Sequence, residues 1–164
     1  MKETTIENLV EIARRLQDEG KPWHFHMLTP DCVLNKRKDK YAFILEDESN
    51  RETYIVYSYK RHMDTGKELV KLLYGKGILE NEPTPTTPGK GMKAILEKAA
   101  QLTKNDLPWH HHILFPKCIF NKHPGKWTII FEESEEGRSM ESVTEHEPIE
   151  DVKKLEILYY SQNK

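Results

Sequence analysis

Apolar residues recur at a helical spacing near the start of the chain. They form the stripe Ile6, Leu9, Val10, Ala13 and Leu16. This spacing predicts an amphipathic helix, because residues three and four apart share one face. Thr4 and Glu7 have the spacing of a capping box at its start, and Gly20 suits its end. After Gly91 the same pattern returns over residues 92–102 and predicts a second such helix.

Four short segments after the first helix are rich in strand formers. Polar turns separate them, and they cover residues 24–28, 32–35, 41–45 and 53–59. The pattern then returns to a helical spacing from Asp64 to Gly75. In the second half, residues 127–131 predict a strand, and the apolar face of a last helix carries Val152, Leu155, Leu158 and Tyr159. The chain is therefore predicted to be an α+β protein.

A gapless shift of 86 positions superposes one part of the chain on another. Residues 22–46 (PWHFHMLTPDCVLNKRKDKYAFILE) align with residues 108–132 (PWHHHILFPKCIFNKHPGKWTIIFE), and 12 of these 25 positions are identical. Only 7 of the other 53 pairs in this register are identical. We infer a tandem duplication of a helix–antiparallel-strands–helix unit in which one patch has resisted substitution.

The duplication predicts two repeats joined by a linker. The repeats are residues 1–78 and 92–164, and residues 79–91 between them are rich in proline, threonine and glycine. A repeat of this size buries only about 60–65% of its unfolded surface and would be marginal alone. An extended linker of this composition can span a small domain. We therefore expect the repeats to pack as one pseudo-twofold symmetric unit, an intramolecular pseudo-dimer.

Composition and charge narrow the function classes. A net charge of −2 is unlike that of a duplex nucleic-acid binder, which carries a basic face. No apolar run approaches the ~18 residues of a membrane span, and the N-terminus lacks the apolar region of a signal peptide. Two cysteines in 164 residues do not make a secreted disulfide scaffold. We expect a cytoplasmic protein that does not contact membranes, and no nucleotide-cofactor motif is present.

The repeated patch holds the residue types of a metal site. Each repeat has two histidines, two residues apart on a predicted strand, so both imidazoles project from one face. A cysteine follows six residues later, after a bend at a proline, and two imidazoles with a thiolate suit zinc or another divalent transition metal. Glu46 and Glu132 are candidates for a further ligand or for orienting a histidine. The predicted ligands are His24, His26 and Cys32 in the first repeat and His110, His112 and Cys118 in the second.

Two other interpretations of the patch stay open. In one, the patch is architectural: tryptophan fills the core, polar side chains bond loop carbonyls, and the protein is a non-catalytic interaction module. In the other, the patch is catalytic, either as a metal-dependent hydrolase or through a metal-free Cys–His–Asn nucleophile set. The candidate catalytic residues are His110, His112, Cys118 and Asn121. No residue pattern names a small-molecule or protein partner.

The repeats differ around the patch. His111 and His123 stand where the first repeat has Phe25 and Arg37. Histidine exchanges protons near neutral pH. We therefore expect the second repeat to hold the more polar pocket and, if only one copy is active, to be the active one.

Overall fold

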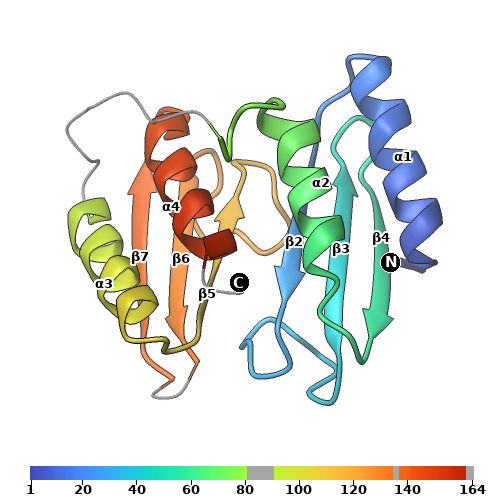
Figure 1. The fold of residues 1–164 in the computed structure, drawn as a ribbon. Coiled ribbons are helices and arrows are strands. Elements are labelled where there is room, and N and C mark those ends of the chain that lie inside the picture. The colour runs from blue at the N-terminus through green and yellow to red at the C-terminus, as the bar shows by residue number, and fades with distance from the viewer. Residues whose placement is uncertain (81–90, 135–136, 162–164) are drawn as a thin grey trace. The chain divides into compact units, whose positions relative to one another are not determined.

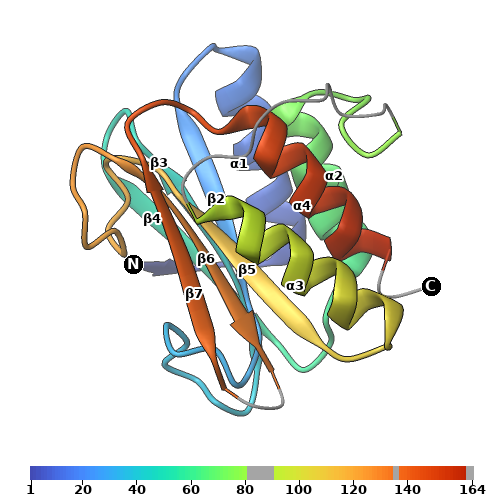
Figure 2. The ribbon, with the colours of Figure 1, turned by 90° about the vertical axis from the view of Figure 1, so that its left-hand side faces the viewer.

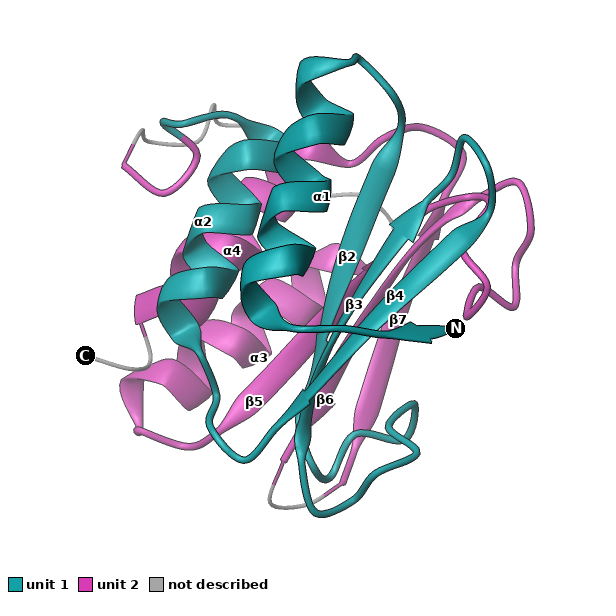
Figure 3. Ribbon diagram, turned by 90° about the vertical axis from the view of Figure 1, so that its right-hand side faces the viewer, with its two compact units in different colours: residues 1–77 teal, residues 78–164 magenta. Residues whose placement is uncertain are grey.

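The structure is a computed structural model that describes residues 1–80, 91–134 and 137–161. The chain divides into two compact units, Met1–Gly77 and Ile78–Lys164 (Figure 3). The predicted linker over residues 79–91 falls mostly on positions outside the described residues. Among the described helices, none combines the length and the apolar character needed to cross a membrane.

Unit 1 is a four-stranded sheet with two helices. Its elements in chain order are β1 (Lys2–Glu3), α1 (Ile6–Asp18), β2 (Trp23–Leu28), β3 (Tyr41–Asp47), β4 (Glu52–Ser58) and α2 (Met63–Tyr74). Strands β2, β3 and β4 form an antiparallel meander, and the short β1 pairs in parallel with β4. The two helices pack against each other and against the sheet (Figure 1).

Unit 2 is a three-stranded antiparallel sheet with two helices. Its elements are α3 (Met92–Lys104), β5 (Trp109–Leu114), β6 (Trp127–Glu133), β7 (Ser139–Thr144) and α4 (Ile149–Ser161). The strand order is β5-β6-β7. Helices α3 and α4 pack together, α3 against β7 and α4 against β5 (Figure 2). Both units contain helices and antiparallel strands, as the predicted α+β class requires.

One face of the unit 1 sheet carries the core. Side chains alternate along a strand, so Trp23, Phe25 and Met27 project from β2 toward the helices. They meet Phe43 and Leu45 of β3 and the apolar stripe of α1. The predicted stripe is therefore the buried face of α1, and the intervening residues of β2 project from the opposite face of the sheet.

Each buried tryptophan also ties a strand to the helix before it. The Nε1 of Trp23 donates a hydrogen bond to Gln17 Oε1 at 2.9 Å. In unit 2, Trp109 Nε1 donates to Thr103 Oγ1 at the same distance. Both tryptophans are buried, as predicted from the repeated patch. These bonds tie β2 to α1 and β5 to α3.

The loop after β2 differs from its predicted structure. Residues 32–35 form turns and not a strand. Hydrogen bonds from Cys32 N to Thr29 O and from Asn35 N to Cys32 O, both 3.0 Å, close two consecutive turns. The same two turns follow β5, at Cys118 and Asn121. The amides that a strand would use are therefore engaged inside the loop.

Two helix starts also differ by a residue from the expectation. Thr5, and not Thr4, caps α1, and its side chain accepts a hydrogen bond from Asn8 N at 3.2 Å. Helix α2 follows His62, which has a left-handed backbone and makes no side-chain capping bond. Helix α2 thus begins at Met63, one residue before the predicted start at Asp64, and Asp64 lies in its first turn.

Candidate metal centre

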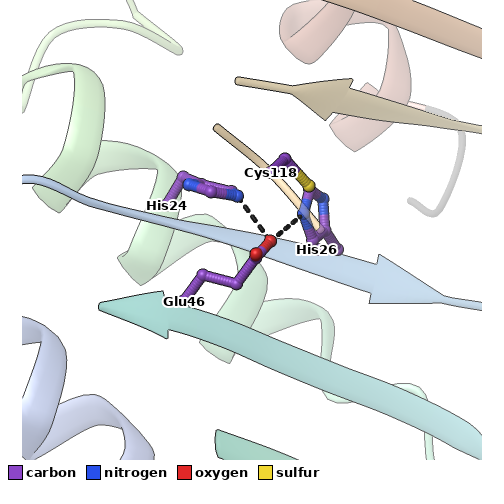
Figure 4. Close-up of side chains that lie close together, drawn as sticks. All are labelled: His24, His26, Glu46 and Cys118. Carbon is purple, nitrogen blue, oxygen red and sulfur yellow. Dashed lines mark hydrogen bonds and ion pairs between the residues drawn. The ribbon is translucent and has the colours of Figure 1, made fainter. Parts of the chain in front are cut away.

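The register of the β2–β3 hairpin brings two histidines and a glutamate onto one face. Because side chains alternate, His24 and His26 project from the face opposite Trp23 and the helices. In the antiparallel register His24 pairs with Glu46, and His26 pairs with Ile44. Directly opposed residues share a face, so Glu46 lies beside both imidazoles (Figure 4).

One carboxylate oxygen meets both rings. Glu46 Oε2 lies 2.6 Å from Nε2 of His24 and 2.9 Å from Nε2 of His26. The rings are in edge contact, with centroids 4.9 Å apart. The histidine side chains are 0% exposed and that of Glu46 is 6% exposed. The three side chains, called the unit 1 trio below, offer ligand atoms within 4.8 Å of one another and could hold a metal ion.

Unit 2 builds the same arrangement from β5 and β6. His110 pairs with Glu132 in the register of these strands. Glu132 Oε2 is in close contact with Nε2 of His110 and lies 3.3 Å from Nε2 of His112. All three side chains are buried, and their ligand atoms again lie within 4.8 Å of one another. They are called the unit 2 trio.

The trios shift the ionisation of their members. Burial raises the pKa of Glu46, but hydrogen bonds from His24 and His26 outweigh it and hold that pKa well below its usual range. The same balance of burial and histidine hydrogen bonds lowers the pKa of Glu132. Each trio therefore holds a charged carboxylate, which is the ionisation state that metal binding requires.

The two histidines of unit 1 shift in opposite directions. Burial opposes protonation of His24, but hydrogen bonds to Glu46 and Glu48 outweigh burial and raise its pKa above the ordinary 6.5. Burial lowers the pKa of His26, and its hydrogen bond to Glu46 only partly offsets this. The imidazole with two carboxylate neighbours thus holds its proton more strongly than the one with a single neighbour.

Glu48 is a site residue that the sequence analysis missed. Its Oε2 lies 3.3 Å from Nδ1 of His24, on the opposite side of the ring from Glu46. Glu48 follows directly after β3, in a turn, where acidic residues are common on any surface. Its role becomes visible only in the folded hairpin, where His24 pairs with Glu46 and the residues after β3 pass Nδ1 of His24.

The cysteines are buried, form no disulfide, and lie in the loops after β2 and β5. Cys32 Sγ accepts a hydrogen bond from Leu34 N at 3.4 Å. Within each unit, the atoms that lie within 4.8 Å of one another come from the trio, and the sulfur of that unit's own cysteine is not among them. The ligand roles predicted for Cys32 and Cys118 therefore stay predictions.

Asn121 is engaged by its own loop. Its side chain donates to Phe115 O and Lys126 O and accepts from His123 N and Thr128 Oγ1, at distances between 2.7 and 3.0 Å. Asn35 bridges the loop of unit 1 in the same way. An amide has two donor hydrogens and one acceptor oxygen. Both donors and the oxygen of Asn121 are used within or beside its own loop, and its candidate catalytic role stays a prediction.

The additional histidines of the second repeat do not extend its trio. His111 projects from the opposite face of β5, where its Nε2 lies 2.5 Å from Glu156 Oε1 of α4. Its ring centroid is 5.0 Å from that of Tyr159 in the core. His123 Nε2 lies 3.3 Å from Glu141 Oε1, and both side chains are exposed. The expected enlarged polar pocket around His111 is therefore wrong, because strand alternation sends that ring to the helix side.

Two imidazole nitrogens and one carboxylate oxygen form a ligand set that zinc accepts, with a fourth position left for another ligand. A glutamate that hydrogen-bonds the far nitrogen of a histidine is a frequent neighbour of such sites. No protein-family model, curated protein or solved structure matches this chain. The two trios are therefore the features of the molecule that bear on its function.

Proposed function

We propose that the protein binds a divalent transition-metal ion, zinc or one of similar ligand preference, at the trio of each unit. One observation carries the proposal: a single carboxylate oxygen lies 2.6 and 2.9 Å from two imidazole nitrogens in a buried position. The contacts recur 86 positions later in unit 2. This recurrence supports the inference that both trios descend from one duplicated unit.

The rival interpretation, an architectural patch, explains only half of its residues. The tryptophans and asparagines make the bonds that join strand to helix and close the loop. Each trio instead buries a carboxylate beside two imidazoles. Burying ionised side chains costs several kcal/mol unless they are well compensated, and apolar residues would often stabilise the same positions better. A bound cation supplies a physical reason for two histidines and a glutamate at this depth.

The proposed fourth ligand is a thiolate from Cys32 or Cys118, the only cysteines of the chain, or a water molecule. A metal with an open position would supply Lewis-acid chemistry, as in zinc hydrolases. The histidine side chains of unit 1 are 0% exposed, and a hydrolase needs access for its substrate. We therefore favour a metal that stabilises the fold over a metal that acts on a substrate.

Metal titration of the full-length protein without a histidine tag tests the proposal. After dialysis against a chelator, the protein is titrated with Zn²⁺, and bound metal is measured by elemental analysis. We expect about two ions per chain and a higher melting temperature of the metal-loaded protein, because an ion that binds only the folded state stabilises it.

Histidine variants locate the sites. His26→Ala and His112→Ala should each lose one ion, since each removes one ligand of one trio. His146→Ala is the control, because His146 is exposed and belongs to neither trio. If no metal binds, or if both trio variants keep two ions, the proposal is wrong and the architectural interpretation is favoured.

Cobalt substitution tests the thiol ligands. Co²⁺ bound by a thiolate gives a near-ultraviolet sulfur-to-metal charge-transfer band, whereas water and nitrogen ligands do not. Cys32→Ser and Cys118→Ser, each combined with His26→Ala or with His112→Ala, identify which thiolate serves which trio. Full charge-transfer intensity in the double variant Cys32→Ser/Cys118→Ser would show that neither sulfur is a ligand.

A further inference from the structure

The two trios differ at one neighbouring position. In unit 1, Glu48 Oε2 lies 3.3 Å from His24 Nδ1, and the Glu48 side chain is 14% exposed. The position 86 residues later is Ser134. The same backbone hydrogen bond is made at both places: Glu48 N donates to Pro22 O at 3.1 Å, and Ser134 N donates to Pro108 O at 3.2 Å. The difference is therefore one of side chain, with a carboxylate in unit 1 and a short hydroxyl in unit 2.

We propose that Glu48 is a positioning residue that makes the unit 1 trio the tighter of two unequal metal sites. The inference rests on the proposed function and adds to it an order of affinity. The additional histidines His111 and His123 had instead predicted the more polar site in the second repeat. Glu48 reverses that order.

The physical basis is the tautomer of His24. To bind a metal through Nε2, the neutral imidazole must carry its proton on Nδ1. A carboxylate at Nδ1 accepts that hydrogen, holds the ring in its orientation and makes the ligating nitrogen more basic. Glu48 stands on the Nδ1 side while Nε2 faces Glu46. The ring is thus preset for a metal at the position where the trio converges.

Ser134 cannot act on His110 in this way. A hydroxyl carries no charge, so it raises the basicity of an imidazole far less than a carboxylate does. Loss of such an outer carboxylate typically weakens metal binding by about 10- to 100-fold. We expect a difference of that size between the two sites of the wild-type protein.

Metal ions compete with protons for imidazole nitrogens, so metal binding weakens at low pH. The affinities are therefore compared at mildly alkaline pH.

The experiment isolates each site in the full-length chain. His112→Ala leaves only the unit 1 trio, and His26→Ala leaves only the unit 2 trio. Zn²⁺ affinity is measured by competition with a chromophoric chelator. In the His112→Ala background, Glu48→Ser should weaken binding by about 10- to 100-fold, and Glu48→Gln, which keeps an acceptor oxygen, should restore part of the loss. Glu11→Ser, an exposed acid on α1, is the control for a simple loss of charge.

The reciprocal variant keeps the test decisive if Glu48→Ser folds poorly. Ser134→Glu in the His26→Ala background should tighten the unit 2 site, because it places a carboxylate at the position equivalent to Glu48. Nitrogen-15 NMR should show the metal-loaded His24 ring protonated at Nδ1. Equal affinities at the two sites, or no gain from Ser134→Glu, would overturn the inference while leaving the metal function intact. If no metal binds at either site, the proposed function itself falls.

Discussion

At the residue scale, His24 and His26 ionise differently although both rings contact the same oxygen of Glu46. For His26, the effect of burial is the largest, and it lowers the pKa of the ring. His24 has Glu48 as a second carboxylate neighbour, and its pKa is raised although burial opposes this. The two histidines therefore affect stability in different pH ranges. The sign of each effect follows from the number of protons bound by the folded and the unfolded protein.

We predict that the metal-free protein is most stable near the ordinary histidine pKa of 6.5, as far as these two residues contribute. Below 6.5 the unfolded chain protonates His26 more readily than the folded one does, so stability rises with pH. Above 6.5 the folded protein retains the proton on His24 that the unfolded chain loses. Stability therefore falls as pH rises through the raised pKa of His24.

Urea unfolding at a series of pH values, in the presence of a chelator, measures this profile. His24→Phe should remove the decline above pH 6.5, and His146→Ala, an exposed control, should retain it. An identical slope in the wild type and in His24→Phe would refute the assignment of that decline to His24.

At the element scale, the loops after β2 and β5 are held by asparagine side chains and not by strand pairing. Asn121 joins the two ends of its loop through Phe115 O and Lys126 O. These two hydrogen bonds fix the shape of the loop between β5 and β6. The asparagine belongs to the architecture of the repeated patch, and the histidines and glutamate of the same patch belong to the trio.

We predict that Asn121→Ala lowers the free energy of unfolding by about 2–4 kcal/mol, because it removes several hydrogen bonds and leaves loop carbonyls without donors. The number of metal ions bound per chain should not change. Denaturant unfolding and elemental analysis check the two statements, and Lys122→Ala, at the exposed neighbouring position, is the control. Wild-type stability with loss of one ion would instead place Asn121 in the metal site.

At the scale of the whole molecule, each unit has one sheet face covered by its helices and one face that carries the trio. The expectation that the repeats pack as a pseudo-twofold symmetric body stays a prediction drawn from the size of a repeat and the length of the linker. Each of the two units has its own sheet and helices, and the prediction is about how these units are arranged.

Small-angle X-ray scattering of the monomeric full-length chain tests this prediction. A single body of 164 residues should have a radius of gyration of about 15 Å. Two units that tumble independently on an extended linker would give a clearly larger value and a two-lobed distance distribution. That result would rule out the pseudo-dimer and leave the two trios as separate sites.

Local patterns in the chain were enough to predict the α+β class, the amphipathic helices and the strands that carry the histidines. Helical stripes and strand alternation depend on neighbours within a few residues, and these are present in the sequence itself. The internal comparison singled out the patch, and strand alternation alone placed His24 and His26 side by side. The turns at residues 32–35 were missed because backbone hydrogen bonds to Thr29 and Cys32 outweighed the strand preference of the side chains.

Tertiary structure decided which distant residues meet the histidines. A strand pairing can slip by one residue and send every side chain to the other face. The sequence alone therefore could not decide whether Glu46 binds a metal or orients a histidine. The observed register places it between both rings, brings Glu48 to the far nitrogen of His24, and sends His111 to the core. These contacts join residues 20 to 45 positions apart, and only the folded hairpins and helix packing bring such residues together.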